Sequence, residues 1–163
     1  MGVHQESKNS NIQLCTFELN SQIYGVNLLD VREVCQQSKI TPIYHASKTV
    51  SGYINIRGEI HLLLNLSEIL GQPNSSDIDK QGIIIFKPTV GELFGTVVDS
   101  VRGVETIPGS SIEDYQTFRQ GEKESMTKNI KNEQLIIGVC KQQDYLIMML
   151  DSRKFLGTVQ NAA

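Results

Sequence analysis

Short apolar runs separated by turn-forming residues dominate the chain, and the clearest pair lies at residues 52–66. Ile54 and Ile56 alternate there with polar residues, and the apolar run 60–66 follows soon after Arg57-Gly58. β-Branched residues suit a pleated sheet, and glycine readily adopts the positive φ of a tight hairpin turn. This stretch therefore predicts two antiparallel strands joined at Arg57-Gly58.

The same pattern predicts a hairpin near the N-terminus and further strands along the chain. Residues 14–19 and 23–26 flank a turn at Asn20-Ser21, and Phe17 and Tyr24 are the large core candidates of this hairpin. Other apolar runs predict strands at residues 83–86, 93–98, 101–107, 135–140 and 145–150.

Three short segments carry helical signals. Residues 28–34 mix the helical and strand periods, which predicts a helical turn passing into a strand. Ser67 is the expected N-cap of a helical turn at 67–70 that Gly71 stops, and Asp151 is the expected cap of a C-terminal helix.

Some ten short strands with only brief helical pieces favour a mainly β fold built from two small barrels. Residues 72–81, rich in Pro, Asn, Ser and Asp, are the expected boundary between the halves. We expect one domain over residues 12–160, with residues 1–11 as a flexible tail. Residues 108–131 show no clear period and are expected to form a mobile loop.

Composition narrows the class of protein. Hydrophobic residues make up 39% of the 163 residues and charged residues 20%, as in an ordinary soluble globular protein. The net charge of −3 provides no basic surface for phosphates, so nucleic acid is not an expected partner. No apolar run approaches the roughly 20 residues that span a bilayer, so we expect a cytoplasmic protein without direct membrane insertion. Its thiols are then expected to be reduced and structural; they are Cys15, Cys35 and Cys140.

Catalytic and metal-binding patterns are absent from the sequence. It contains neither a nucleophile-elbow nor a phosphate-loop motif, and its three histidines are too scattered for a metal site; they are His4, His45 and His61. His61 lies in an apolar strand and is expected to be a partly exposed strand-face residue. Asp99 is expected to cap a turn or to pair with an arginine such as Arg102. We therefore expect no enzyme and no cofactor.

Two other functional classes stay open at this stage. Cys35 or Cys140 would act as a nucleophile only with a histidine close in space, so a small redox or histidine-dependent enzyme is one alternative. A ligand-binding barrel is the other.

A protein-binding surface is the remaining functional signal. Val31, Glu33 and Val34 are expected near Arg57, and an apolar patch rimmed by charge is typical of a protein interface. Their spacing is equally compatible with Val31 and Val34 in the core and a solvated Glu33.

Several motifs in order resemble the CheW family, the coupling adaptors of bacterial chemotaxis. They are Y-G-V-N-L-L-D-V-R-E-V at residues 24–34, I-T-P-I at 40–43, G-Y-I-N-I-R-G-E-I at 52–60 and G-T-V-V-D-S-V at 95–101. The resemblance extends over residues 14–156. It implies two SH3-like five-stranded β-barrels packed around a shared apolar interface.

The resemblance also implies a role. Family members are non-catalytic scaffolds that couple the cytoplasmic tips of methyl-accepting chemotaxis receptors to the regulatory domain of the histidine kinase CheA, which has the same fold. The receptor tip docks between the two barrels, while barrel ends meet the kinase and build rings at the inner membrane. Arg57 is the strongest candidate in the expected partner-binding set, which is Val31, Glu33, Val34, Gly52, Asn55, Arg57, Gly95 and Val101.

This chain departs from the family pattern at several positions. Asn65 replaces an acid, His61-Leu62 replaces a step with proline, residues 44–47 lack the common prolines, and the stretch 108–131 is longer than usual. An adaptor of a pilus or other non-flagellar pathway would keep the core and alter such loops. The receptor, the pathway and any self-association stay open.

Overall fold

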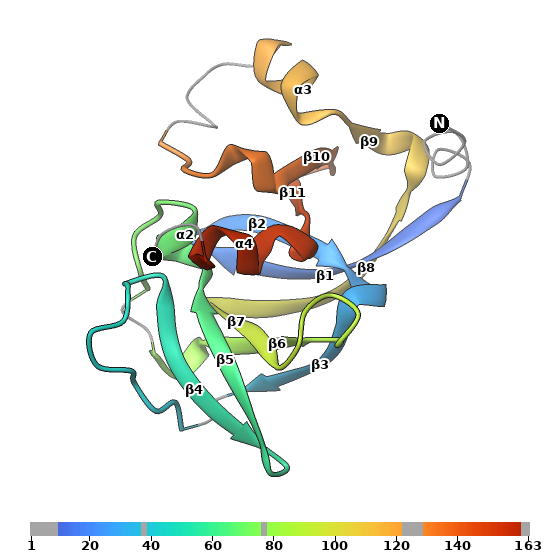
Figure 1. Ribbon diagram of the computed structural model, residues 1–163. Coiled ribbons are helices and arrows are strands. Elements are labelled where there is room, and N and C mark those ends of the chain that lie inside the picture. Colours follow the sequence, from blue (N-terminus) through green and yellow to red (C-terminus); the bar gives the residue numbers. More distant parts are fainter. Residues whose placement is uncertain (1–9, 37–38, 76–77, 122–128, 161–163) are drawn as a thin grey trace.

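The computed structural model describes residues 10–36, 39–75, 78–121 and 129–160, which form two mixed β-sheets (Figure 1). The first sheet contains β1 (Asn11–Leu19), β2 (Gln22–Asn27), β8 (Ser100–Pro108), β9 (Ile112–Glu113), β10 (Ile136–Lys141) and β11 (Leu146–Leu150). The second contains β3 (Val31–Gln36), β4 (Val50–Ile56), β5 (Glu59–Asn65), β6 (Gly82–Phe86) and β7 (Phe94–Val98). The strand orders are β8-β1-β2-β11-β10-β9 and β3-β6-β7-β5-β4.

The mainly β fold with two subdomains is confirmed. Each sheet combines antiparallel pairs with one parallel pair, β2 with β11 in the first sheet and β5 with β7 in the second. The second sheet has the expected five strands. The first has six, because the two-residue strand β9 pairs with the edge of β10.

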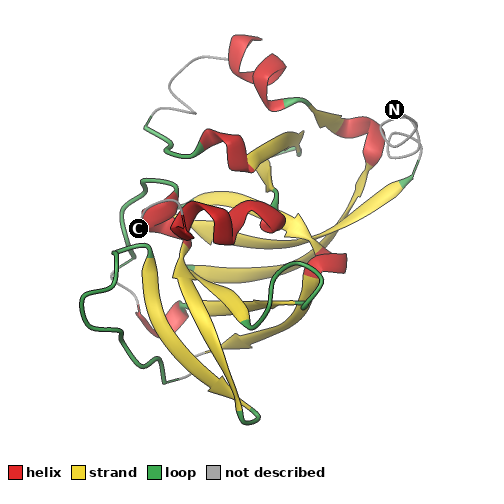
Figure 2. Ribbon diagram, in the orientation of Figure 1, coloured by secondary structure: helices red, strands yellow, loops and turns green. Residues whose placement is uncertain are grey.

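The helices are short and lie between strands or, for the last of them, after the final strand (Figure 2). They are α2 (Leu66–Ile69), α3 (Tyr115–Gly121) and α4 (Phe155–Gln160), with 3₁₀ turns at Leu28–Asp30, Ile78–Lys80, Gly109–Ser111, Glu133–Leu135 and Ser152–Lys154. The turn Leu28–Asp30 leads directly into β3, as the mixed periodicity of residues 28–34 predicts.

The predicted N-terminal hairpin is confirmed in detail. Asn20 and Ser21 have φ values of 49° and 65°, which match the positive φ of a tight hairpin turn. Phe17 and Tyr24 are buried cross-strand partners, and their rings stack with centroids 6.1 Å apart. Asp99 caps this turn, because its Oδ2 accepts a hydrogen bond from the Asn20 amide at 2.7 Å.

The chain passes between the sheets at places other than the expected boundary. Residues 72–81 lie between α2 and β6, and the strands on both sides, β5 and β6, belong to the second sheet. The chain changes sheet at Leu28–Asp30 and again at Asp99. The composition of residues 72–81 therefore marks a connection within one sheet and does not separate the two subdomains.

Three apolar clusters follow from this arrangement. One lies within the first sheet and contains residues such as Leu14 and Ile147, and another lies within the second sheet around Ile54 and Leu63. The largest takes residues from both sheets and from α4, whose Phe155 packs edge-on against Phe86 at 5.7 Å. This central core joins the two subdomains.

Two local expectations were wrong. The N-cap of α2 is Asn65, whose Oδ1 accepts a hydrogen bond from the Glu68 amide at 3.2 Å, while Ser67 is the second residue of the helix and is buried. Residues 108–121 are ordered as β9 and α3, because Tyr115 and Phe118, three residues apart, are buried in the central core.

Asp151 caps the turn Ser152–Lys154 as predicted. Residues 122–128 and the expected tail up to residue 9 lie outside the described residues.

Candidate partner-binding surfaces

The hairpin of β4 and β5 presents Arg57 at its tip. Arg57 and Gly58 have φ values of 51° and 86°, and the side chain of Asn55 accepts a hydrogen bond from the Gly58 amide at 2.9 Å. A non-glycine residue at positive φ carries a steric cost of about 1 kcal/mol. Asn55 offsets part of that cost, so it acts on the turn that holds Arg57 in position.

Two ion pairs join this hairpin to β3, although β3 and β4 are opposite edges of the second sheet. Arg57 pairs with Glu33, and Arg32 Nη2 lies 3.5 Å from Glu59 Oε1. The sheet therefore curves until its edges meet through side chains. The Arg57 side chain is 66% exposed, so the pair contributes little to stability and leaves donors for a second carboxylate.

Val31, Val34 and Val101 lie along the junction between the two sheets. Val31 is buried in the central core. Val34 pairs with Ile84, a central-core residue, yet stays 41% exposed. Val101 packs on the same core and so closely against Gly82 that a Cβ there would clash with its side chain.

Two further exposed apolar residues come from segments that flank this junction. Leu29, in the turn before β3, is 75% exposed, and Val104, on β8, is 54% exposed. Val104 pairs with Cys15, whose side chain belongs to the central core. We call Leu29, Val34 and Val104 the junction patch. Sequence analysis missed Leu29 and Val104, since exposure cannot be read from an alternating run.

A second apolar surface lies on the outer face of the hairpin. Tyr53 and Ile60 are 43% and 50% exposed, and Leu93 is 39% exposed. Tyr53 is the cross-strand partner of Leu62, and the Leu62 amide donates to the Leu93 carbonyl at 2.8 Å. Ile60 lies two residues before Leu62, on the same face of β5. We call Tyr53, Ile60 and Leu93 the hairpin patch.

The two candidate glycines are interior backbone positions. A Cβ on Gly52 would lie within 3.0 Å of the Thr41 carbonyl oxygen, because Thr41 forms backbone hydrogen bonds with Tyr53 beside it. A Cβ on Gly95 would meet the Ile84 carbonyl oxygen just as closely. Both residues allow close strand contacts and have no side chain to offer a partner.

The residues considered for chemistry are buried or half-buried. His61 is 1% exposed, which corrects the expectation of a partly exposed side chain; its Nδ1 lies 3.2 Å from the Glu59 carbonyl oxygen. Cys15 and Cys140 are buried as expected, but Cys35 is only half-buried. Burial raises the pKa of all three thiols, to about 11 for Cys140, which disfavours the reactive thiolate.

Two kinds of feature are absent among the residues that the structure describes. No three His, Cys, Asp or Glu residues among them lie close enough together to hold a metal ion. None of their helices has the length and apolar character needed to cross a membrane.

Comparison with known proteins connects these surfaces to a family. A family model described as a CheW-like domain matches residues 13–160. The chemotaxis protein CheW of Thermotoga maritima is 33% identical over 101 residues, which cover 62% of this chain and 66% of that protein. The chemotaxis protein CheW of Treponema pallidum is 27% identical over 154 residues, covering 92% of this chain and 85% of that protein.

A solved structure shows the same fold. The crystal structure of the scaffolding protein TtCheW from Thermoanaerobacter tengcongensis superposes with a TM-score of 0.73 and 25% sequence identity. The match covers 90% of this chain and 92% of that chain. The family model, the relatives and the fold agree, and the chain belongs to the CheW-like domain family.

Proposed function

We propose that this protein is a non-catalytic scaffold of chemotaxis signalling that holds a chemoreceptor tip and the regulatory domain of the kinase CheA at the same time. The observation that carries the proposal is the presence of two exposed apolar surfaces, the junction patch and the hairpin patch. Both are near the Glu33–Arg57 pair, since Val34 follows Glu33 and Tyr53 is on the strand that leads to Arg57. A scaffold for two partners needs two such surfaces.

The junction patch is the proposed site for the receptor tip. Leu29, Val34 and Val104 come from three different segments, and the cross-strand partners of Val34 and Val104 belong to the central core. An amphipathic helix binds such an apolar strip by inserting side chains from one of its faces. Val31 and Val101, largely covered by the core, support the strip from beneath.

The hairpin patch and Arg57 are the proposed kinase site. Tyr and Arg side chains are enriched among residues that dominate binding energy, and Arg57 has a planar group that suits a carboxylate. Glu33 holds the guanidinium near β3, so Arg57 is partly oriented before a partner binds. Gly52, Asn55 and Gly95 shape the strands behind this surface. We place the protein in the cytoplasm, beside the receptor array.

Co-sedimentation with a receptor cytoplasmic fragment and CheA tests the proposal. Arg57→Glu should remove CheA and keep the receptor, whereas Val104→Glu should weaken receptor binding and keep CheA. The loss should amount to about 1 to 4 kcal/mol of binding free energy for a central interface residue.

Matched controls are available outside both patches, on α3 and on β10. Arg119 forms an exposed ion pair with Glu133, as Arg57 does with Glu33, and Ile137 is 46% exposed on β10. Arg119→Glu and Ile137→Glu should leave both partners bound. If the wild-type protein binds neither partner, the proposed function is wrong; if controls and test variants behave alike, the two surfaces are wrongly placed.

A further inference from the structure

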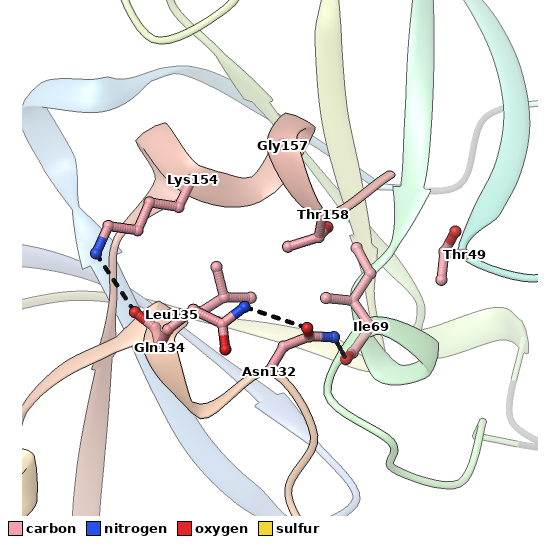
Figure 3. Close-up of a pocket in the computed structure, with 8 residues that line it drawn as sticks. All are labelled: Thr49, Ile69, Asn132, Gln134, Leu135, Lys154, Gly157 and Thr158. Carbon is pink, nitrogen blue, oxygen red and sulfur yellow. Dashed lines mark hydrogen bonds between the residues drawn. The ribbon is translucent and has the colours of Figure 1, made fainter. Parts of the chain in front are cut away.

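A cleft of about 590 Å³ lies between the two subdomains, beside the C-terminal helix (Figure 3). Ile69 of α2 and Thr49, just before β4, line it from the second subdomain. Asn132, Gln134 and Leu135 line it from the segment before β10. Its volume is within the range of roughly 300 to 1,000 Å³ found for small-molecule sites. The cleft shares no residue with the junction patch or the hairpin patch.

The cleft is hollow because α4 presents little side chain to it. Gly157 lies on its wall, and nothing is found within 4 Å of the point where a Cβ would be. Lys154 and Thr158, three residues before and one after, line the same cavity. Ile69 and Leu135 are almost fully buried and form apolar walls.

Three of the polar lining residues, Lys154, Gln134 and Asn132, are linked by a chain of hydrogen bonds. Lys154 Nζ donates to the Gln134 carbonyl at 3.5 Å, Gln134 Nε2 donates to Asn132 Oδ1 at 3.2 Å, and Asn132 Nδ2 donates to the Ile69 carbonyl at 2.6 Å (Figure 3). An ammonium has three N–H donors and an amide nitrogen has two. Each nitrogen in the chain therefore keeps at least one donor after these bonds.

The charge of the cleft is positive. Lys154 is the charged side chain among the eight lining residues in Figure 3, and no carboxylate of the described residues pairs with it. A cation with fixed amide donors beside apolar walls favours a ligand with an anionic end and an apolar body.

We propose that this cleft binds a small organic carboxylate, with its carboxylate at Lys154 and Gln134 and its apolar part against Ile69 and Leu135. Because the site touches both subdomains, the bound ligand would link α2 to α4. The inference is independent of the scaffold role, since it concerns the isolated protein.

Titration of the ¹⁵N-labelled full chain with hexanoate, followed by NMR, tests the proposal. Hexanoate should shift the amide signals of Ile69, Gln134 and Thr158 along saturating curves, while hexylammonium, with the opposite charge, should not. Lys154→Gln should weaken hexanoate binding about tenfold, which corresponds to the loss of one charge-assisted hydrogen bond. Lys87→Gln, at an exposed lysine outside the cleft, is the matched control and should bind as the wild type does.

Gly157→Leu provides a second test, since a leucine side chain would fill the open space beside the helix. Its folded state is verified by the unchanged dispersion of signals from both sheets, and hexanoate should then cause no saturating shift. The proposal is overturned if wild-type shifts do not saturate, if hexylammonium binds as well as hexanoate, or if Gly157→Leu binds like the wild type.

Discussion

Thr96 and Thr16 form a natural pair for measuring what a buried hydroxyl contributes to stability. Both are fully buried strand residues. The Thr16 hydroxyl donates to the Gly103 carbonyl at 3.1 Å, whereas the Thr96 hydroxyl has no hydrogen-bond partner among the described residues. Thr96 lies on β7 between Phe94 and Val98, both in the central core, so its hydroxyl is in an apolar environment.

Replacing each threonine by valine should change stability in opposite directions. Thr96→Val exchanges an unpaired hydroxyl for a methyl group of similar size, which should stabilise the fold by about 1 to 2 kcal/mol because the desolvation cost disappears. Thr16→Val leaves the Gly103 carbonyl without its donor and should destabilise the fold by a similar amount, about 1 to 2 kcal/mol.

Urea unfolding measures both variants in one assay when the slope of unfolding free energy against urea concentration is held equal for all proteins. The transition midpoint should rise for Thr96→Val and fall for Thr16→Val, and the melting temperature should move by about 2 to 4 °C for each kcal/mol in a chain of this size. If Thr96→Val is destabilised as much as Thr16→Val, the Thr96 hydroxyl has a partner in solution and the reasoning is refuted.

Three further outcomes are expected. Gly52→Ala should lose about 2 to 4 kcal/mol of stability in urea unfolding, because its Cβ meets the Thr41 carbonyl, while Gly58→Ala, in open space, should lose only about 1 kcal/mol. The double variant Glu33→Arg/Arg57→Glu should restore the ion pair without restoring CheA co-sedimentation. Recovery of binding would mean that the pair acts only on hairpin geometry. The free energy of unfolding should fall between pH 9 and about 11. Burial raises the pKa of Cys140 from 9.0 to about 11 in the folded protein, so this thiol ionises first in the unfolded chain. Cys140→Ala should show a smaller fall.

Local sequence patterns predict much of the fold. Arg57-Gly58 and Asn20-Ser21 specify their turns through backbone conformation alone, so both hairpins are predictable from a few residues. The points at which the chain passes from one sheet to the other are not predictable in this way, because β1 pairs with β8, a strand more than eighty residues away in the sequence. The N-cap of α2 shows the same limit on a small scale. Asn65 and Ser67 are both suitable cap residues, and the position at which β5 ends determines that Asn65 is the cap.

The surfaces were less predictable than the fold. Glu33 and Arg57 are brought together by the curvature of the second sheet, which no spacing encodes. Gly52 and Gly95 lie in motifs that resemble the family pattern. The structure shows that glycine is needed there because a neighbouring backbone lies too close for a Cβ atom. His61 was expected to be partly exposed, as histidine is intermediate in its tendency to be buried, and its full burial depends on strand neighbours such as Ile54.

The order of strands in the chain has a consequence for synthesis on the ribosome. All five strands of the second sheet lie within residues 31–98, so that sheet has its complete set of pairing partners once this segment has emerged. The first sheet is completed later, because the hairpin β1–β2 pairs with β8 and β11 from the later part of the chain. Contacts between distant segments form slowly, and their apolar faces stay open until then. During translation, the N-terminal hairpin therefore keeps an unpaired strand edge on each side until β8 and β11 have emerged.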